Sequence, residues 1–138
     1  MNERYRLLRP LASGGMAELF LGVARGAEGF EKPVAIKRVL PHLSEKKQFI
    51  GMFLDEARVC AHLSHSNCVQ VFDIGVGDNT YFIVMEYVDG RPLSAIIRSQ
   101  GPLLADRAAS IGADVAGALS FAHRNGVIHR DVKPGNVL

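Results

Sequence analysis

The distribution of hydrophobic and polar residues predicts two kinds of structure in two parts of the chain. Up to about residue 40, and again over residues 69–87, apolar residues form short runs or alternate with polar ones, which is typical of β-strands. Beyond residue 92 the apolar residues recur at spacings of three and four, which is typical of amphipathic helices. The pattern therefore predicts a small α+β region, residues 1–88, followed by a helical region, residues 89–138.

Five strands are expected in the first region. We predict a twisted antiparallel sheet whose last two strands form a hairpin around Gly77, Asp78 and Asn79. A helix is expected from Ser44, as its N-cap, to about residue 63, with Glu45 in the first turn, where the helix dipole favours a carboxylate. The predicted strands cover residues 5–11, 18–24, 34–40, 69–76 and 80–87.

Two helices are expected in the second region, over residues 93–98 and 105–124, the longer one ended by Asn125 and Gly126. The longer helix carries an apolar stripe at spacings of four, four and three, which has to be buried against something. The stripe consists of Ile111, Val115, Leu119 and Ala122.

The face of the first helix combines apolar residues with one carboxylate, that of Glu56. Its members are spaced by four, three, four and three residues. If Glu56 is buried in this stripe it needs a cation, because an unpaired buried charge is costly. Lys37 is a candidate, because alternation along residues 34–39 puts it on one face with Ala35 and Val39. Alternatively, Glu56 marks the edge of the stripe, and the Lys37 ammonium reaches water. The stripe consists of Phe49, Phe53, Glu56, Cys60 and Leu63.

Composition excludes some classes of partner. Of the 138 residues 48% are hydrophobic and 22% are charged, which is typical of a globular protein. A net charge of +2 with scattered basic residues indicates neither nucleic acid nor an anionic membrane as partner, and leaves the oligomeric state unknown. Two cysteines, no apolar leader and no apolar stretch of about 20 residues predict a soluble protein in the cytoplasm.

Residues 129–136 read His-Arg-Asp-Val-Lys-Pro-Gly-Asn and resemble the catalytic loop of protein kinases. The resemblance implies that Asp131 orients the substrate hydroxyl and accepts its proton, and that Asn136 ligates Mg²⁺. It implies that Lys133 neutralises charge on the transferred phosphoryl group. In that family a lysine at this position accompanies serine and threonine specificity.

Residues 34–37, Val-Ala-Ile-Lys, resemble the kinase motif whose lysine binds the α- and β-phosphates of ATP and whose alanine leaves room for adenine. Lys37 and Ala35 would have these roles, and Glu56 would be the glutamate of helix C that pairs with the lysine. Residues 12–17, Ala-Ser-Gly-Gly-Met-Ala, stand where kinases have a glycine-rich loop, with Gly14 as the middle glycine. Alanines replace the outer two glycines, which weakens the expected phosphate contact, and the segment alone would be assigned as a hairpin turn.

The same resemblance implies which residues would form the adenine pocket. Leu11 and Leu19 would cover the adenine ring. Residues 83–90 resemble the hinge between kinase lobes, with Met85 as gatekeeper and the backbone of Glu86 and Val88 as hydrogen-bond partners of adenine. By its local content the same stretch is equally an ordinary buried strand that leads into a turn.

The chain is thus identified as similar to bacterial serine/threonine protein kinases, with a protein-kinase-like α+β fold, ATP and Mg²⁺ as cofactors and a protein serine or threonine as acceptor. The resemblance covers the first half of a kinase domain and stops before the Asp-Phe-Gly segment. We therefore expect no turnover by the chain alone, since Asn136 by itself should hold the metal poorly. Two alternatives are a non-catalytic module that binds nucleotide or a kinase, and a non-functional remnant.

Overall fold

The computed structural model describes residues 4–138, which form two compact units. The first, called the sheet unit, contains the residues up to 62 together with residues 69–87. The second, called the helical unit, contains residues 63–68 together with residues 88–138. Each unit carries its own part of the residues that the sequence analysis singled out.

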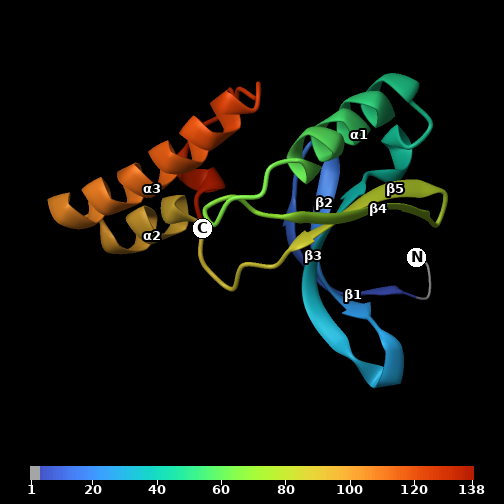
Figure 1. Ribbon diagram of the computed structural model, residues 1–138. Helices are drawn as coiled ribbons and strands as arrows, with labels where there is room; N and C mark the ends of the chain where they lie inside the picture. Colours follow the sequence, from blue (N-terminus) through green and yellow to red (C-terminus); the bar gives the residue numbers. More distant parts are fainter. Residues whose placement is uncertain (1–3) are drawn as a thin grey trace. The chain divides into compact units, whose positions relative to one another are not determined.

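The sheet unit is a five-stranded antiparallel sheet with the strand order β1-β2-β3-β5-β4, and the helix α1 packs on one of its faces (Figure 1). This agrees with the predicted number of strands and their antiparallel arrangement. The elements are β1 (Tyr5–Ser13), β2 (Ala17–Arg25), β3 (Glu31–Val39), α1 (Lys47–Ala61), β4 (Val71–Gly77) and β5 (Thr80–Glu86).

Two apolar clusters form the core of the sheet unit, one on each face of β3. Val34 and Ile36 belong to the first cluster and Val39 to the second, as the predicted alternation requires. The second cluster includes Phe53 and Ala57 of α1, so Lys37, which alternates with Ile36, is on the side of the sheet that the helix covers. The first cluster is completed by Tyr5, Phe82 and Val84, and the second by Leu43 and Ile83.

The predicted start of α1 is wrong. The helix begins at Lys47 with Lys46 in the N-cap position, and it has no acidic residue in its first turn. The Ser44 hydroxyl instead donates a hydrogen bond of 2.6 Å to the Pro41 carbonyl oxygen, in a short 3₁₀ turn over Pro41–Leu43. Proline at the first position of this turn presets its backbone, and Ser44 satisfies a carbonyl there instead of capping the helix.

The backbone at two predicted chain reversals has the conformation that their residues favour. Asp78 and Asn79 join β4 to β5 with φ angles of 52° and 58°, as a tight two-residue hairpin requires. The longer helix of the other unit ends at Arg124, and Gly126, which follows the C-cap residue Asn125, has a φ of 76°. Gly126 N–H donates to His123 O, and Val127 N–H donates to Ala122 O, both at 3.0 Å. This pair of bonds is the Schellman motif, which favours glycine.

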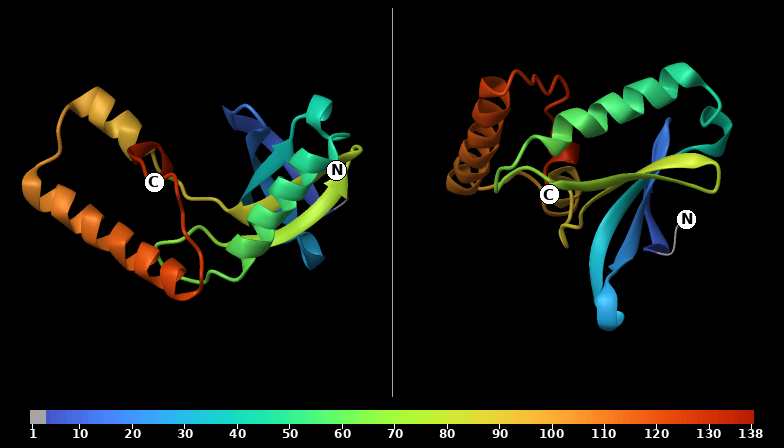
Figure 2. Two further views of the ribbon diagram at one scale, coloured as in Figure 1. Left: turned by 90° about the horizontal axis from the view of Figure 1, so that it is seen from above. Right: turned by 45° about the vertical axis from the view of Figure 1, so that its right-hand side comes forward.

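The helical unit contains α2 (Leu93–Gln100), α3 (Ala105–Arg124) and a 3₁₀ turn, η3 (Pro134–Asn136). The turn packs against α2, where Leu93 N–H donates to Val137 O at 2.8 Å (Figure 2). The predicted stripe of α3 is the more protected line of that helix: Ala122 is buried, and Ile111, Val115 and Leu119 are half-buried. Over residues 4–138 no helix combines the length and apolar character needed to cross a membrane.

Candidate functional site

An ion pair joins the sheet to its helix. Lys37 Nζ on β3 donates to Glu56 Oε1 on α1 over a distance of 2.6 Å. This is the pairing that the sequence predicts. Of the two alternatives for Glu56, burial within the stripe is wrong, because 52% of its side chain is exposed, against 29% for Lys37. The buried positions of α1 are Phe53 and Ala57, so Glu56 lies at the edge of the apolar stripe.

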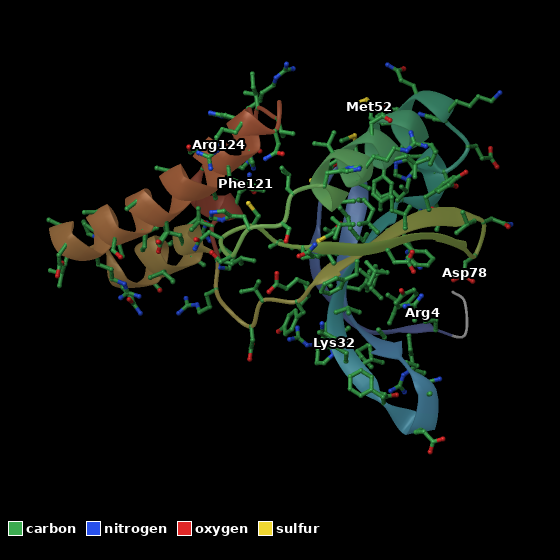
Figure 3. The ribbon with its side chains drawn as sticks, viewed as in Figure 1. Arg4, Lys32, Met52, Asp78, Phe121 and Arg124 are labelled. Carbon is green, nitrogen blue, oxygen red and sulfur yellow. The ribbon has the colours of Figure 1, made fainter. Side chains whose placement is uncertain are left out.

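A cavity of about 80 Å³ lies beside this ion pair, within the sheet unit. Apart from the two charged residues its walls are apolar, and they come from α1, from β3 and from the turn between β1 and β2. Met52 of α1, one of the wall residues, is labelled in Figure 3. The lining residues are Met16, Ala17, Lys37, Val39, Phe49, Met52, Phe53 and Glu56.

The turn between β1 and β2 does not need glycine for its own fold. It is closed by a hydrogen bond of 2.9 Å from Gly14 N–H to Ala17 O, and neither Gly14 nor Gly15 has a positive φ. A methyl group on Gly15 would meet nothing within 4 Å, and one on Gly14 would make an ordinary 3.6 Å contact with Ala17 O. The two glycines thus leave the outer surface of the turn bare, which suits close approach of a ligand.

The two alanines of this turn are ordinary strand residues. Ala12 pairs with Leu19 in the β1/β2 ladder, and Ala17 is half-buried against the core cluster that includes Val39 and Phe53. Strand pairing therefore continues as far as these positions. The Ala17 methyl group contributes to packing where a glycine would contribute none.

Four of the predicted adenine and phosphate residues share one face of the sheet. Lys37 pairs with Leu19, and Ala35 pairs with Met85 across the β3/β5 ladder. Residues directly opposite each other point to the same side, and so do residues two apart on a strand. Ala35 is buried, with 6% of its surface exposed. Leu11 lies at a register irregularity between Pro10 and Ala12, so the ladder does not assign it to this face.

The backbone of the predicted hinge is partly engaged. Glu86 N–H donates to Gln70 O at 2.8 Å, so the Glu86 backbone could take part in a hydrogen bond with adenine only as an acceptor, through its carbonyl oxygen. Val88, in the helical unit, accepts a hydrogen bond of 2.9 Å from Gly90 N–H through its carbonyl.

The loop before η3 gathers an acid, a base and an amide. Lys133 Nζ lies 2.7 Å from Asp131 Oδ2. Asn136 Nδ2 donates to the same carboxylate oxygen at 3.2 Å and to the Asp131 carbonyl oxygen at 2.8 Å. Asp131 N–H donates to His129 Nδ1 at 3.3 Å, so the histidine supports the loop backbone. The three predicted residues of the catalytic loop are therefore brought together.

The surroundings of Asp131 keep it ionised and exposed. The hydrogen bond from Lys133 is the main cause that lowers the pKa of Asp131 below its usual value, and the Asn136 amide adds to it. Of its side chain 61% is exposed. Arg130, just before it, has a φ of 62°, a conformation that non-glycine residues rarely adopt and that often marks a functional loop.

The oxygen atoms of Asp131 and Asn136 are the groups of this loop that suit a magnesium ion. Within residues 4–138 no group of three or more His, Cys, Asp or Glu side chains gathers that could hold a metal ion. Asp131 and Asn136 together offer carboxylate and amide oxygens, which suit Mg²⁺, an ion that commonly binds through one or two carboxylates with water and substrate phosphates. The donor set fits that ion as part of a shared site.

One contact of the ion pair could not be read from the motifs. The Lys37 ammonium also lies 5.9 Å from the centre of the Phe53 ring. Phe53 precedes Glu56 by three residues, a spacing that puts both on one side of a helix. This spacing was the feature of the sequence from which the contact between Phe53 and Lys37 could have been inferred.

Comparisons with known proteins match almost the whole chain. A family model described as the protein kinase domain matches residues 5–138. The chain is 43% identical to the tyrosine-protein kinase MasK of Myxococcus xanthus and 43% identical to the serine/threonine-protein kinase PksC of Streptomyces coelicolor. These matches cover 96% and 98% of this chain but only 22% and 25% of the two relatives.

The chain is also 39% identical to the serine/threonine-protein kinase PrkC of Bacillus subtilis, over 100% of this chain and 21% of the relative. Among solved structures, the kinase domain of PknI from Mycobacterium tuberculosis superposes with a TM-score of 0.77 at 33% identity. That match covers 97% of this chain and 53% of the PknI chain. The chain spans about a quarter or less of these curated relatives and about half of the solved kinase domain. It belongs to the protein kinase domain family.

Proposed function

We propose that this chain is the N-terminal part of a bacterial serine/threonine protein kinase domain, which transfers the γ-phosphoryl group of ATP to a serine or threonine hydroxyl of a protein. Protein kinases in general use ATP with Mg²⁺. The observation that carries the proposal is the grouping of Asp131, Lys133 and Asn136 on one loop. Residues 1–88 would be the N-lobe and residues 89–138 the start of the C-lobe. The reaction would take place in the cytoplasm, where ATP is available.

The catalytic loop is suited to this reaction by its charges. An ionised Asp131 can accept a hydrogen bond from the substrate hydroxyl and then its proton. Lys133, now paired with that carboxylate, would stabilise negative charge on the transferred phosphoryl group. Asn136 would share a magnesium ion with the phosphates through its amide oxygen, because its nitrogen is used in holding Asp131.

The nucleotide would bind on the sheet unit. Lys37, held by Glu56, would contact the phosphates, and the bare turn at Gly14 would let backbone amides approach them. Leu11, Leu19 and Ala35 would contact the adenine ring, and Met85 would lie behind it. The Glu86 carbonyl and the Val88 backbone would hydrogen-bond the adenine edge.

Phosphoryl transfer in the full-length gene product tests this proposal. Asp131→Asn should lower the rate of label transfer from γ-labelled ATP to a protein acceptor by roughly 10²- to 10⁴-fold, because it removes the proton acceptor. Asp114→Asn, which removes the same charge from the exposed side of α3, is the matched control and should leave the rate unchanged. An Asp131→Asn variant as active as the wild type would contradict the proposed role.

The identity of the acceptor needs a separate test, because one relative is named a tyrosine kinase. Peptides that differ only in a serine, threonine or tyrosine acceptor should be labelled on serine or threonine. The presence of Lys133 two residues after Asp131 supports this expectation. Labelling of tyrosine alone would overturn the serine/threonine assignment and leave the kinase assignment intact.

A second candidate is a nucleotide-binding or kinase-interacting module without catalysis. The observation that favours it is that Lys37, Glu56 and the adjoining cavity all lie within the sheet unit. It predicts that ATP raises the melting temperature of the protein in both the wild type and Asp131→Asn, while neither transfers phosphate. Transfer by the wild type would rule it out.

A further inference from the structure

The ion pair between Lys37 and Glu56 is too exposed to fix its own geometry. More than half of the Glu56 side chain and 29% of the Lys37 side chain are exposed. Exposed pairs of this kind contribute little to stability, because water screens them and two long side chains have to be ordered. Something other than mutual attraction has to keep the Lys37 ammonium where it is.

Phe53 supplies a rigid wall at this point. Its side chain is buried, with 6% of its surface exposed, in the cluster that contains Val39 of β3 and Ala57 of α1. Its ring faces the ammonium of Lys37 at 5.9 Å, within the range of a cation–π interaction. The ammonium thus lies between an exposed carboxylate at 2.6 Å and a buried aromatic ring.

The position of Phe53 on α1 links the ring to Glu56 as well. The two residues are three apart on the helix, so the packing that buries Phe53 sets the rotation of α1 and turns Glu56 toward β3. Phe53, Lys37 and Glu56 also line the same cavity of about 80 Å³. One buried ring therefore governs both partners of the exposed pair.

We propose that Phe53 is a positioning residue for phosphate binding, which holds the Lys37 ammonium against its ring and orients Glu56 toward it. This inference rests on the proposed function, because it assumes that Lys37 contacts the phosphates of ATP. Phe53 itself touches neither nucleotide nor acceptor. Its effect should appear in the contribution of the phosphates to binding and not in that of the adenosine.

The test measures the dissociation constants of Mg²⁺-ATP and of adenosine in the full-length gene product and compares their ratio among variants. Loosening of the fold would weaken the binding of both ligands, whereas misplacement of Lys37 would weaken the binding of ATP alone. Phe53→Leu and Phe53→Met remove the ring and keep an apolar side chain, and Phe53→Tyr keeps the ring. Phe49→Leu is the matched control, because Phe49 lines the same cavity from α1, but its ring lies 5.8 Å from Lys46 Nζ.

Loss of the ring should lower the preference for ATP over adenosine roughly two- to fivefold, the size of a cation–π contact at a partly exposed site. Phe53→Tyr and Phe49→Leu should keep the wild-type preference. An unchanged preference in folded Phe53→Leu or Phe53→Met, or an equal loss in Phe49→Leu, overturns the inference. Lys37→Met separates the two claims: if it leaves the preference unchanged, the proposed function of Lys37 is wrong and the inference fails with it.

Discussion

Replacement of Tyr5 by phenylalanine tests how the two edges of the sheet are tied together. Tyr5 is on β1 and Asp73 on β4, which are the outermost strands on opposite sides of the sheet. The Tyr5 hydroxyl nevertheless donates a hydrogen bond of 2.6 Å to Asp73 Oδ2, and its ring packs edge-on against Phe82. Arg4, labelled in Figure 3, lies 3.5 Å from the same carboxylate oxygen. The sheet is therefore curved enough for side chains from its two edges to reach each other.

The expected loss of stability in Tyr5→Phe can be worked out from the pKa of the Tyr5 phenol and from its hydrogen bond. Burial, and then the hydrogen bond and negative charge of Asp73, raise the pKa of Tyr5 from 10.0 to about 12. At 1.36 kcal/mol per pKa unit this corresponds to about 3 kcal/mol in favour of the neutral phenol. The part of this effect that Tyr5→Phe removes is the hydrogen bond, and a hydrogen bond to a charged group contributes about 1.5–3 kcal/mol to stability. Asp73 keeps Arg4 and the Ile74 N–H as partners, so we expect Tyr5→Phe to lower the free energy of unfolding by about 1.5–3 kcal/mol.

The pH dependence of this stabilisation identifies the Tyr5 phenol as its source. The pKa of Tyr5 is higher in the folded state than in the unfolded state, so its stabilisation is complete below pH 10 and is lost as the pH rises from 10 to about 12. Urea unfolding of wild type and Tyr5→Phe across this range measures the difference directly. In phenolate absorbance, the late titration of Tyr5 in the wild type should be absent from Tyr5→Phe. A difference below about 0.5 kcal/mol, or one that is the same at pH 9 and pH 12, would refute the reasoning.

Three further substitutions test other local features. Gly75→Ala should destabilise the sheet unit by about 1–3 kcal/mol in urea unfolding, because the new methyl would clash with Cζ of the fully buried Phe82. Gly15→Ala should have no such effect, because its methyl would meet nothing within 4 Å. Lys133→Met should raise the pKa of Asp131 toward its ordinary value in an NMR titration of the carboxyl carbon, and an unchanged pKa would show that Lys133 is not its main cause. Gly126→Ala should destabilise α3 by about 1–2 kcal/mol, since the φ of Gly126 is 76°. Gly112→Ala in the same helix should stabilise it by up to about 1 kcal/mol, because alanine favours the helix and its methyl would meet nothing within 4 Å. Equal shifts of the melting temperature in the two variants would contradict the capping argument.

The parts of the fold that depend on local patterns could be predicted from the sequence. Alternation along β3 identified the side of Val34 and Ile36 and that of Lys37 and Val39, because side-chain direction in a strand has a period of two whatever surrounds it. The stripe of α3 was likewise identified from spacing alone. The grouping of Asp131 with Asn136 lies within six consecutive residues, so a short loop determines it.

Features that depend on how elements pack could not be predicted in this way. The bond from Tyr5 to Asp73 needs a sheet curved enough to bring β1 near β4, which no local pattern encodes. Ser44 is a good N-cap residue by type, but a proline turn just before it uses its hydroxyl. Glu56 falls in the apolar stripe by spacing, yet the orientation of α1 puts it at the edge, where it is half exposed.

The exposure of Glu56 changes the physical interpretation of its pair with Lys37. A buried pair would be held together because breaking it leaves a charge without a partner, at a cost of about 3–5 kcal/mol. An exposed pair contributes about 0–1 kcal/mol to stability and can separate at little cost, since water solvates each charge. The orientation of α1 therefore has to come from Phe53, Ala57 and their apolar neighbours in the core cluster. In this sheet unit the charges would select the ligand, while apolar packing keeps them in position.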